Sequence, residues 1–492
     1  MLVPFDVLIY LMTLGQRTDV SSMMRTCRTL YSAGMPSLLS FDIRFYDYQR
    51  FAAFCSFVNV DAPTRSRFLR KIWLNTDHLA QASGTRTLGH ILSILQHAAQ
   101  LHRLSIDTIN EERAGPLDPC LIEAFSSLTS IKDLSILSCI TKDTAKVLKS
   151  LQSASITKVH ICFQREHFSL NHDGPWTDED NIDPILLLQK YRSSLEILKL
   201  YWFIFPPSPH HGIYYPRLTE LMITDDCIPL SLELLVYSFP NLRILRIVDL
   251  DDFELDFDFD SDTVSDGKEC RQANILSQVQ MRWESLEYVS SEMLCLYSLG
   301  LCCKVNHLRL RLPGYNNTAN LSYTTDVLSM TQPTRLSIDI QLSSDRTELI
   351  QTQLYHVVDY HGLTHLLIQV DFCPEDSEAD YNIPGVLDDI IAALPPLRYM
   401  THLSIRLEYG FCNTDIRAFL STVLEREHQN IATRAMEAAP ALRYIVVHSV
   451  HAGHSVWQVT RNDGDASLLE KLTGEAAQKI SSEPELRSQW QA

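Results

Sequence analysis

A short apolar frame recurs along most of this chain and limits the folds it can adopt. The frame is L-x-x-L-x-L, with Ile, Val or Met allowed for Leu, and its copies lie about 31 residues apart on average. One copy of so short a pattern is weak evidence, whereas eleven clear copies indicate a repeat. The eleven clear copies and two weaker ones (Leu286 and Pro333) start at Leu69, Leu101, Ile131, Ile156, Leu195, Leu218, Leu242, Leu286, Val305, Pro333, Leu363, Met400 and Leu442.

The segments between the frames have the apolar spacing of amphipathic helices. Residues 385–394 and 141–151 both place apolar side chains three and four positions apart. Thr141 or Asp143 is expected to cap the second of these helices. A unit of strand, loop, helix and loop joins consecutive parallel strands. The sequence therefore predicts an α/β solenoid with parallel strands on the concave face and helices on the convex face.

This pattern resembles the leucine-rich-repeat architecture over about residues 65–450. It departs from that family in two ways. The Asn or Cys that follows the strand in regular repeats is mostly absent, although Cys139 and Cys162 lie near that place, and the spacing between copies is uneven. The resemblance therefore implies an irregular array with excursions at the long intervals.

The first 45 residues lack the frame and predict a small helical module instead. Pro4 and Asp6 favour the start of a first helix. Its apolar side chains at helical spacing are Val7, Leu8, Leu11 and Met12.

A second helix is expected in the same module. Thr18 or Asp19 is predicted to cap it, and it is predicted to carry Val20, Met23, Met24, Cys27 and Leu30. Gly34 and Pro36 are then expected to break the chain. Residues 46–64 are predicted to be a linker or helical cap.

This module resembles an F-box, and the chain is similar to fungal F-box-like proteins with leucine-rich repeats. Val3-Pro4 stands where the family has Leu-Pro, while Thr26 replaces a Val and Leu30-Tyr31 occupies the place of a Trp. A helical cap that covers the first repeat is the alternative. The resemblance implies docking on the adaptor subunit of an SCF-type ubiquitin ligase through Val3, Pro4, Asp6, Val7, Leu8, Leu11, Cys27 and Arg28.

Composition limits the partners. The 492 residues carry a net charge of −18, with 42 Lys+Arg against 60 Asp+Glu. This acidic balance argues against nucleic acid or an anionic membrane as the partner. No apolar run reaches the length of a membrane span, and no signal peptide is visible. We therefore expect an intracellular protein, cytoplasmic or nuclear, whose cysteines are free and buried in apolar runs, as at Cys27, Cys139, Cys162 and Cys295.

The chain contains no motif of known catalytic chemistry. The P-loop, dinucleotide-binding, nucleophile-elbow and H-E-x-x-H patterns do not occur, and the 12 cysteines do not have zinc-site spacing. We therefore expect neither an enzyme nor a cofactor or metal site. His448, His451 and His454, spaced three apart, predict a polar strand end, and residues 451–492 are expected to be a terminal strand and tail.

An acidic insert, residues 249–269, interrupts the repeats. Asp256, Asp258 and Asp260 imitate a calcium loop, but Ser261 and Gly267 occupy the positions where Gly and Glu are required. No calcium site is therefore predicted. The first half of the insert has the alternation of an edge strand, and the rest is expected to be an acidic loop.

The function that the resemblance implies is substrate recognition in an SCF-type ubiquitin ligase, with the adaptor, the cullin and an unknown target protein as partners. The alternative is a repeat scaffold with no ligase link. Side chains beside the fourth frame position point away from the core and include several arginines and histidines, so they predict a positive docking patch, unless they are merely a solvated strand face. The predicted target-binding residues are His307, Arg309, Arg311, Arg335, His365, His402 and Arg406.

Overall fold

The computed structural model of the chain contains two compact units. One comprises Met1–Cys227 with Tyr237–Leu242, and the other comprises Ile228–Val236 with Arg243–Ala492. The structure describes residues 4–107, 117–137, 142–163, 183–201, 203, 209–224, 230–248, 261–312, 319–342, 362–372, 383–409, 427–449, 453–461 and 467–481.

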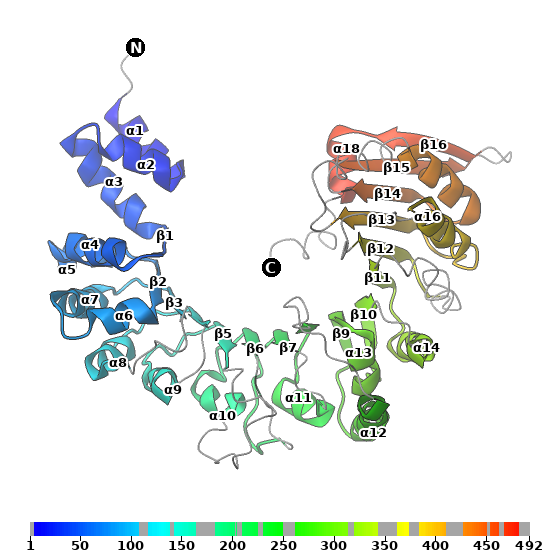
Figure 1. Ribbon diagram of the computed structural model, residues 1–492, viewed down its shortest axis with the longest axis horizontal. Coiled ribbons are helices and arrows are strands. Elements are labelled where there is room, and N and C mark those ends of the chain that lie inside the picture. Colours follow the sequence, from blue (N-terminus) through cyan, green and yellow to red (C-terminus); the bar gives the residue numbers. More distant parts are fainter. Residues whose placement is uncertain are drawn as a thin grey trace. The chain divides into compact units, whose positions relative to one another are not determined.

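The first unit begins with three helices and continues as alternating strands and helices (Figure 1). Its elements are α1 (Phe5–Leu14), α2 (Arg17–Met24), α3 (Arg28–Ser40), β1 (Asp42–Ile43), α4 (Tyr48–Asn59), α5 (Ala62–Arg65), η1 (Ser66–Phe68), β2 (Lys71–Asn75), α6 (Thr76–Ala82), α7 (Arg86–His97), β3 (Arg103–Asp107), α8 (Pro119–Ser126), β4 (Asp133–Ile136), α9 (Lys142–Ser150), β5 (Lys158–Cys162), α10 (Pro184–Leu187), η4 (Gln189–Tyr191), β6 (Ile197–Tyr201) and β7 (Glu220–Thr224).

The alternation continues through the rest of the chain and ends in an antiparallel pair of strands and a helix. The elements are α11 (Leu232–Ser238), β8 (Ile244–Val248), α12 (Ser261–Ser277), β9 (Ser285–Glu292), α13 (Met293–Leu299), β10 (Lys304–Leu312), α14 (Ala319–Thr331), β11 (Arg335–Leu342), β12 (His365–Phe372), α16 (Ile383–Ala392), β13 (His402–Tyr409), a helix at 427–438, β14 (Tyr444–Ser449), β15 (Gly453–Arg461), β16 (Ser467–Leu472) and α18 (Gly474–Ser481).

The strands predicted from the frame are confirmed. Each of the thirteen frames contains one strand, from β2 to β14. Within the first unit β1 to β7 pair in chain order and in parallel. Within the second unit β8 to β14 do the same. The fold is therefore of the mixed α/β class, with sequential parallel strands in each unit.

The fourth position of the frame forms a continuous apolar row in each unit. Leu104 pairs in register with Leu134, and Leu336 pairs with Leu366, which pairs with Leu403. All five side chains are buried, and the helices cover this face of the strands (Figure 1). A strand alone could not bury its leucine, so each repeat depends on its neighbours.

The carbonyl at the second frame position provides a second link between repeats. The Thr364 carbonyl accepts N–H bonds from Thr401 (2.9 Å) and His402 (3.1 Å), and the Thr401 hydroxyl donates to it as well (3.1 Å). The Thr364 hydroxyl in turn donates to the Thr334 carbonyl (2.9 Å). Hydroxyl donors of this kind occupy the second frame position of five repeats, namely Thr157, Thr219, Thr334, Thr364 and Thr401.

The predicted repeat helices are confirmed, but one cap differs. Helix α16 buries Val386 and Ile390 as expected, and α9 buries Leu148. Asp143 lies inside α9 instead of capping it, and Thr141 lies outside the described residues.

Two details of the N-terminal module differ from the predictions. Gln16 caps α2, because the Asp19 carboxylate accepts the Gln16 N–H (3.1 Å) from the third helical position. Helix α2 ends at Met24, and α3 continues through Gly34 and Pro36, which were expected to break the chain.

Close packing explains why Gly34 lies inside a helix. A Cβ atom at this position would lie 2.4 Å from Met12 Cε and 2.5 Å from Met24 Cγ. Met12 and Met24 form the core of the module together with Val20 and Leu30. The glycine therefore allows α3 to approach the other two helices closely, and this gain outweighs its low helix propensity.

The second half of the acidic insert is a helix, and the expected loop there is wrong. Buried polar groups hold α12 in place: Asn274 accepts from the Leu232 N–H (2.8 Å) and donates to the carbonyls of Leu230 (3.0 Å) and Ser298 (3.1 Å). Gln278, directly after α12, donates to the Gly300 carbonyl (2.7 Å) and accepts from the Cys302 N–H (2.7 Å) in the segment after α13. Residues 249–260, with the expected edge strand and the calcium-like aspartates, lie outside the described residues.

The C-terminal part contains more regular structure than the expected strand and tail. Strands β15 and β16 are antiparallel, and α18 packs Ala477 and Ile480 against Val446 and Val456. Helix α18 thus lies on the side of the strands opposite α16 (Figure 1).

None of the helices in the described part of the chain has the length and apolar character of a membrane span.

Replacing Gly34 by Ala should destabilise the N-terminal module by about 1–3 kcal/mol, because the added methyl group overpacks the Met12 and Met24 contacts. Gly89 in α7 is the matched control: a Cβ there meets no atom within 4 Å, so Gly89→Ala should stabilise the chain by about 0.5–1 kcal/mol. Thermal melts measure both changes. Equal effects of the two substitutions would contradict the packing role of Gly34.

Leu366 and Leu367 are neighbours on β12 that face opposite sides of the strand. Leu366 is buried beneath the helices, whereas Leu367 is half-buried on the open face. Leu366→Ala should therefore cost about 2–5 kcal/mol of unfolding free energy, and Leu367→Ala clearly less. Denaturant unfolding of the two variants gives the comparison, and the reverse order would refute the facing of this strand.

Candidate functional site

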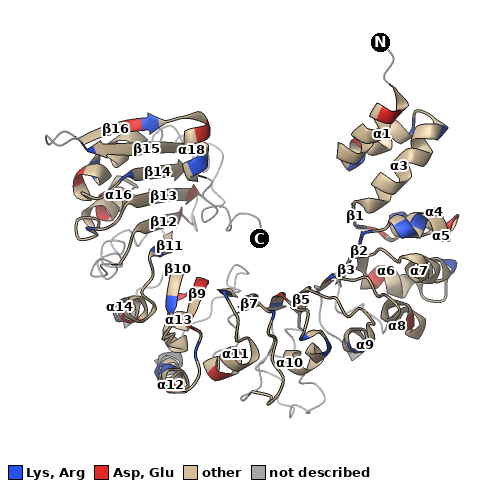
Figure 2. Ribbon diagram, turned by 180° about the vertical axis from the view of Figure 1, so that it is seen from behind, with Lys and Arg blue, Asp and Glu red and all other residues tan. Residues whose placement is uncertain are grey.

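The first candidate surface is an apolar face of α1. Val7, Tyr10, Leu11 and Leu14 lie three and four residues apart and are 45–66% exposed, and Phe5 is also exposed. The opposite face of the helix supplies Met12 and part of Leu8 and Ile9 to the module's core. Asp6 is the one charged residue of α1, which is otherwise drawn tan in Figure 2.

The predicted adaptor-binding residues are mostly at the surface. Pro4, Asp6, Val7, Leu11, Cys27 and Arg28 are exposed, and Val3 lies outside the described residues. Leu8 differs, because it packs half-buried against the module's own core. Sequence reasoning missed Phe5, Tyr10 and Leu14, although the spacing of Tyr10 and Leu14 from Val7 was visible in the sequence.

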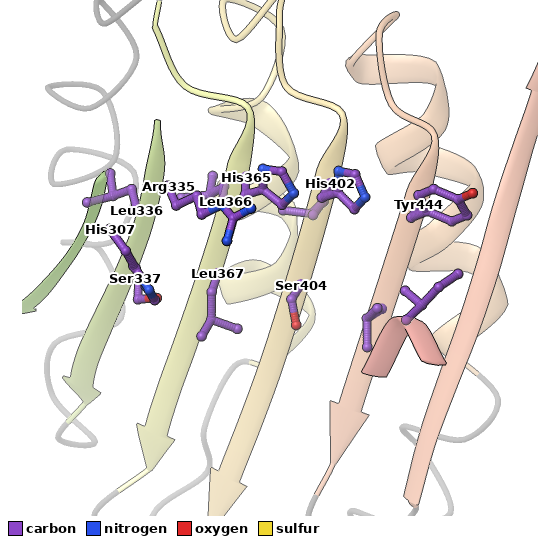
Figure 3. A pocket seen from close by; sticks show the side chains of 13 residues that line it. His307, Arg335, Leu336, Ser337, His365, Leu366, Leu367, His402, Ser404 and Tyr444 are labelled. Atoms are coloured by element: carbon purple, nitrogen blue, oxygen red, sulfur yellow. The ribbon is translucent and has the colours of Figure 1, made fainter. Parts of the chain in front are cut away.

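The second candidate surface is the open face of β10 to β14. Four predicted target-binding residues and Tyr444 lie in one row: His307 pairs with Arg335, Arg335 with His365, His365 with His402 and His402 with Tyr444. The rings of His365 and His402 stack with centroids 4.1 Å apart and planes 9° apart, and the Tyr444 ring lies 5.1 Å from His402 (Figure 3).

A threonine precedes each of the stacked histidines and sets its tautomer. The Thr364 hydroxyl donates its only proton to the Thr334 carbonyl (2.9 Å). Its oxygen therefore accepts the His365 Nδ1–H (2.8 Å). Thr401 and His402 repeat this arrangement, with 3.1 and 2.8 Å. The proton of the neutral His365 ring is therefore on Nδ1, and its Nε2 has the lone pair.

Burial keeps three histidines of this face, His307, His365 and His448, neutral. It lowers the pKa of His307 and His365 to about 4, and the nearby Arg335 adds to both effects. The pKa of His448 falls to about 4 for the same main reason. At neutral pH these side chains add no positive charge to the surface.

Carboxylates lie beside the arginines of the same face. Arg309 Nε lies 2.6 Å from the buried Asp339 carboxylate, and Arg406 pairs with Glu408. Asp371 adjoins Glu408 in the next row, and its burial, with help from Glu408, raises the Asp371 pKa to about 6. The predicted excess of positive charge is therefore largely balanced, although Arg309, Arg311 and Arg406 occupy the strand positions that were predicted.

A pocket opens on this row of side chains (Figure 3). The rings of His365, His402 and Tyr444 line it together with the side chain of Leu367. Ile480 of α18 also lines it. The remaining lining residues are His307, Arg335, Leu336, Ser337, Leu366, Leu403, Ser404 and Val446.

The described part of the chain offers little material for metal or thiol chemistry. It holds no group of three His, Cys, Asp or Glu residues that could bind a metal ion. His448 pairs with His454 across β14 and β15, and His451 lies outside the described residues. Burial raises the pKa of the Cys55 thiol to about 12 and that of Cys303 to about 11, so neither is a ready nucleophile.

The described cysteines form no disulfide, but they are not all buried as expected. Cys27 and Cys120 are exposed, and each lies at the start of a helix. Cys139 lies outside the described residues. The free cysteines are Cys27, Cys55, Cys120, Cys162, Cys270, Cys295, Cys302 and Cys303.

Comparisons with known proteins identify no family. No family model matches the chain, and no curated protein matches it. Among solved structures, the chain is similar to ribokinase from Giardia lamblia over 39% of this chain and 61% of that one, at 12% identity and a TM-score of 0.18. Similarity at that level carries no argument about fold or function.

The lowered histidine pKa values predict a loss of stability in acid. A histidine with a folded-state pKa near 4 binds fewer protons than the unfolded chain, so the free energy of unfolding falls as the pH drops from about 6.5 toward 4. Asp371, whose pKa is raised, opposes this trend below about pH 6. The melting temperature should fall from pH 7.5 through pH 6 to pH 5. The substitution His307→Gln should reduce this pH dependence more than His211→Gln, which is at an exposed site. A flat profile would contradict the burial of these rings.

Proposed function

We propose that this protein is the substrate-recognition subunit of an SCF-type ubiquitin ligase and is not itself an enzyme. In this proposal α1 to α3 form an F-box that docks on the adaptor, and the cullin joins through the adaptor. The strands and helices after them form a leucine-rich-repeat solenoid whose open strand face binds the target protein. Such a complex would act in the cytoplasm or nucleus.

The exposed face of α1 is the observation that carries the proposal. A helix with apolar residues all round is normally buried, yet Val7, Tyr10, Leu11 and Leu14 of α1 remain exposed. Contiguous apolar surface of this kind marks an interaction site. A cap that only covers the first repeat has no need of a second apolar face, so this feature favours an F-box over a cap.

The repeat geometry supports the solenoid. Thirteen strands follow one frame, neighbours pair in register in chain order within each unit, and the second frame position bonds to the preceding repeat throughout much of the chain. These features are those of stacked repeats, in which each unit contacts its neighbours. The open strand face then presents rows of side chains from several repeats to one partner.

Replacing Leu11 and Leu14 together by Ser should strongly weaken binding of the SCF adaptor, and with it capture of the cullin. Loss of buried apolar anchors commonly costs 2 kcal/mol or more, about 30-fold in affinity. Both side chains are exposed, so the module should remain folded. Purification of the tagged protein with the adaptor, followed by measurement of their dissociation constant, tests the effect.

The control is a second exposed apolar pair at the end of α12. Leu276 and Val279 are 63% and 82% exposed, and their replacement by Ser should leave adaptor binding unchanged. If the adaptor binds the Leu11 and Leu14 variant as tightly as the wild type, the F-box proposal fails. If the wild type binds no adaptor, the alternative of a scaffold without a ligase link is favoured.

A further inference from the structure

The pocket on β10 to β14 combines an apolar wall with a hydrogen-bond acceptor of fixed orientation. Leu367, Val446 and Ile480 supply apolar surface, and the stacked rings of His365 and His402 form an aromatic edge. The Thr364 oxygen holds the Nδ1–H of His365, so Nε2, on the ring edge away from the backbone, accepts and cannot donate.

Two of the arginines near the pocket are paired with carboxylates. Arg309, on the same strand as the lining residue His307, is engaged by the Asp339 carboxylate, and Arg406 by Glu408. Arg335 lines the pocket and brings one cation to it. A cation next to aromatic and apolar walls attracts the face of an aromatic ring as well as a negative charge.

These features select among the side chains of a partner protein. An aliphatic side chain or phenylalanine would cover the His365 acceptor without giving it a donor, and a buried acceptor left unpaired is costly. A lysine or arginine would be placed close to Arg335. An indole N–H or a phenol O–H supplies the missing donor, and its ring fits the apolar wall.

We propose that this pocket binds a tryptophan or tyrosine side chain of the target protein, with the ring against Leu367, Val446 and Ile480 and its donor on His365 Nε2. The inference rests on the proposed function in one respect, that the open strand face binds the target. It replaces docking through the predicted positive patch with docking of an aromatic anchor. Such anchors are frequent hot spots of protein interfaces.

The test uses small amides in place of the unidentified target. N-acetyl-tryptophanamide and N-acetyl-tyrosinamide should bind the full chain with a dissociation constant of about 1 mM or lower. N-acetyl-phenylalaninamide, which lacks the side-chain donor, should bind at least ten-fold more weakly. NMR titration with observation of the histidine ring signals measures the affinities and should shift the His365 ring signals. This comparison needs only the wild-type protein.

A variant pair then locates the site. His365→Phe retains a ring for stacking and removes the acceptor, so it should weaken tryptophan-amide binding about ten-fold and abolish the preference over the phenylalanine amide. His160→Phe is the control, because His160 also lies half-buried on a strand face, in the first unit. It should leave binding unchanged.

Three outcomes would overturn the proposal: equal binding of the tryptophan and phenylalanine amides, unchanged tryptophan-amide binding by His365→Phe, or tighter binding of phenyl phosphate than of N-acetyl-tyrosinamide, which would identify an anion site. None of these outcomes involves the adaptor. Failure of the proposed function would instead appear as absent adaptor binding in the wild type, so the two failures are distinguishable.

Discussion

The structure depends on contacts between neighbouring repeats, because one repeat alone can neither bury its core leucine nor provide donors for its own backbone carbonyl. The leucine at the fourth frame position is buried only between neighbours such as Leu336, Leu366 and Leu403, and the carbonyl at the second position finds its donors in the following repeat. Apolar burial and backbone hydrogen bonding therefore enforce the same register. Because register fixes which side chains face outward, the outward residues of successive strands fall into rows, and the functional surface follows from the core.

Much of the repeat array could be predicted because the frame is a local signal. All thirteen strands, and helices such as α9 and α16, follow from apolar spacing that a few residues determine. The helix through Gly34 could not be predicted in this way, since a glycine at that place is favoured by contacts with Met12 and Met24, which are distant in sequence. Helix α12 was missed for a similar reason: its hold on the rest of the unit comes from Asn274 and Gln278, whose backbone partners belong to other segments.

The same difference between local signals and long-range contacts applies to the candidate surfaces. Alternation along a strand places His307, Arg309 and His365 on the open face, and that placement was available from the sequence. The charge state of these side chains was not available from the sequence. Asp339, which neutralises Arg309, belongs to the next strand, and the low histidine pKa values arise from burial by several strands together. On α1 the error was different: an apolar stripe was recognised, but Tyr10 and Leu14, which extend it on the exposed face, were not counted.

The two surfaces suit partners of different kinds. The exposed face of α1 has one charged residue and few fixed polar groups, so its affinity comes from apolar area and discriminates little between similar surfaces. This suits an invariant partner such as the adaptor of the proposed complex. The open strand face contains paired charges and a His365 acceptor that Thr364 orients. A ligand that leaves such groups buried without partners loses affinity, so this face can reject most partners and is where we expect target selectivity to arise.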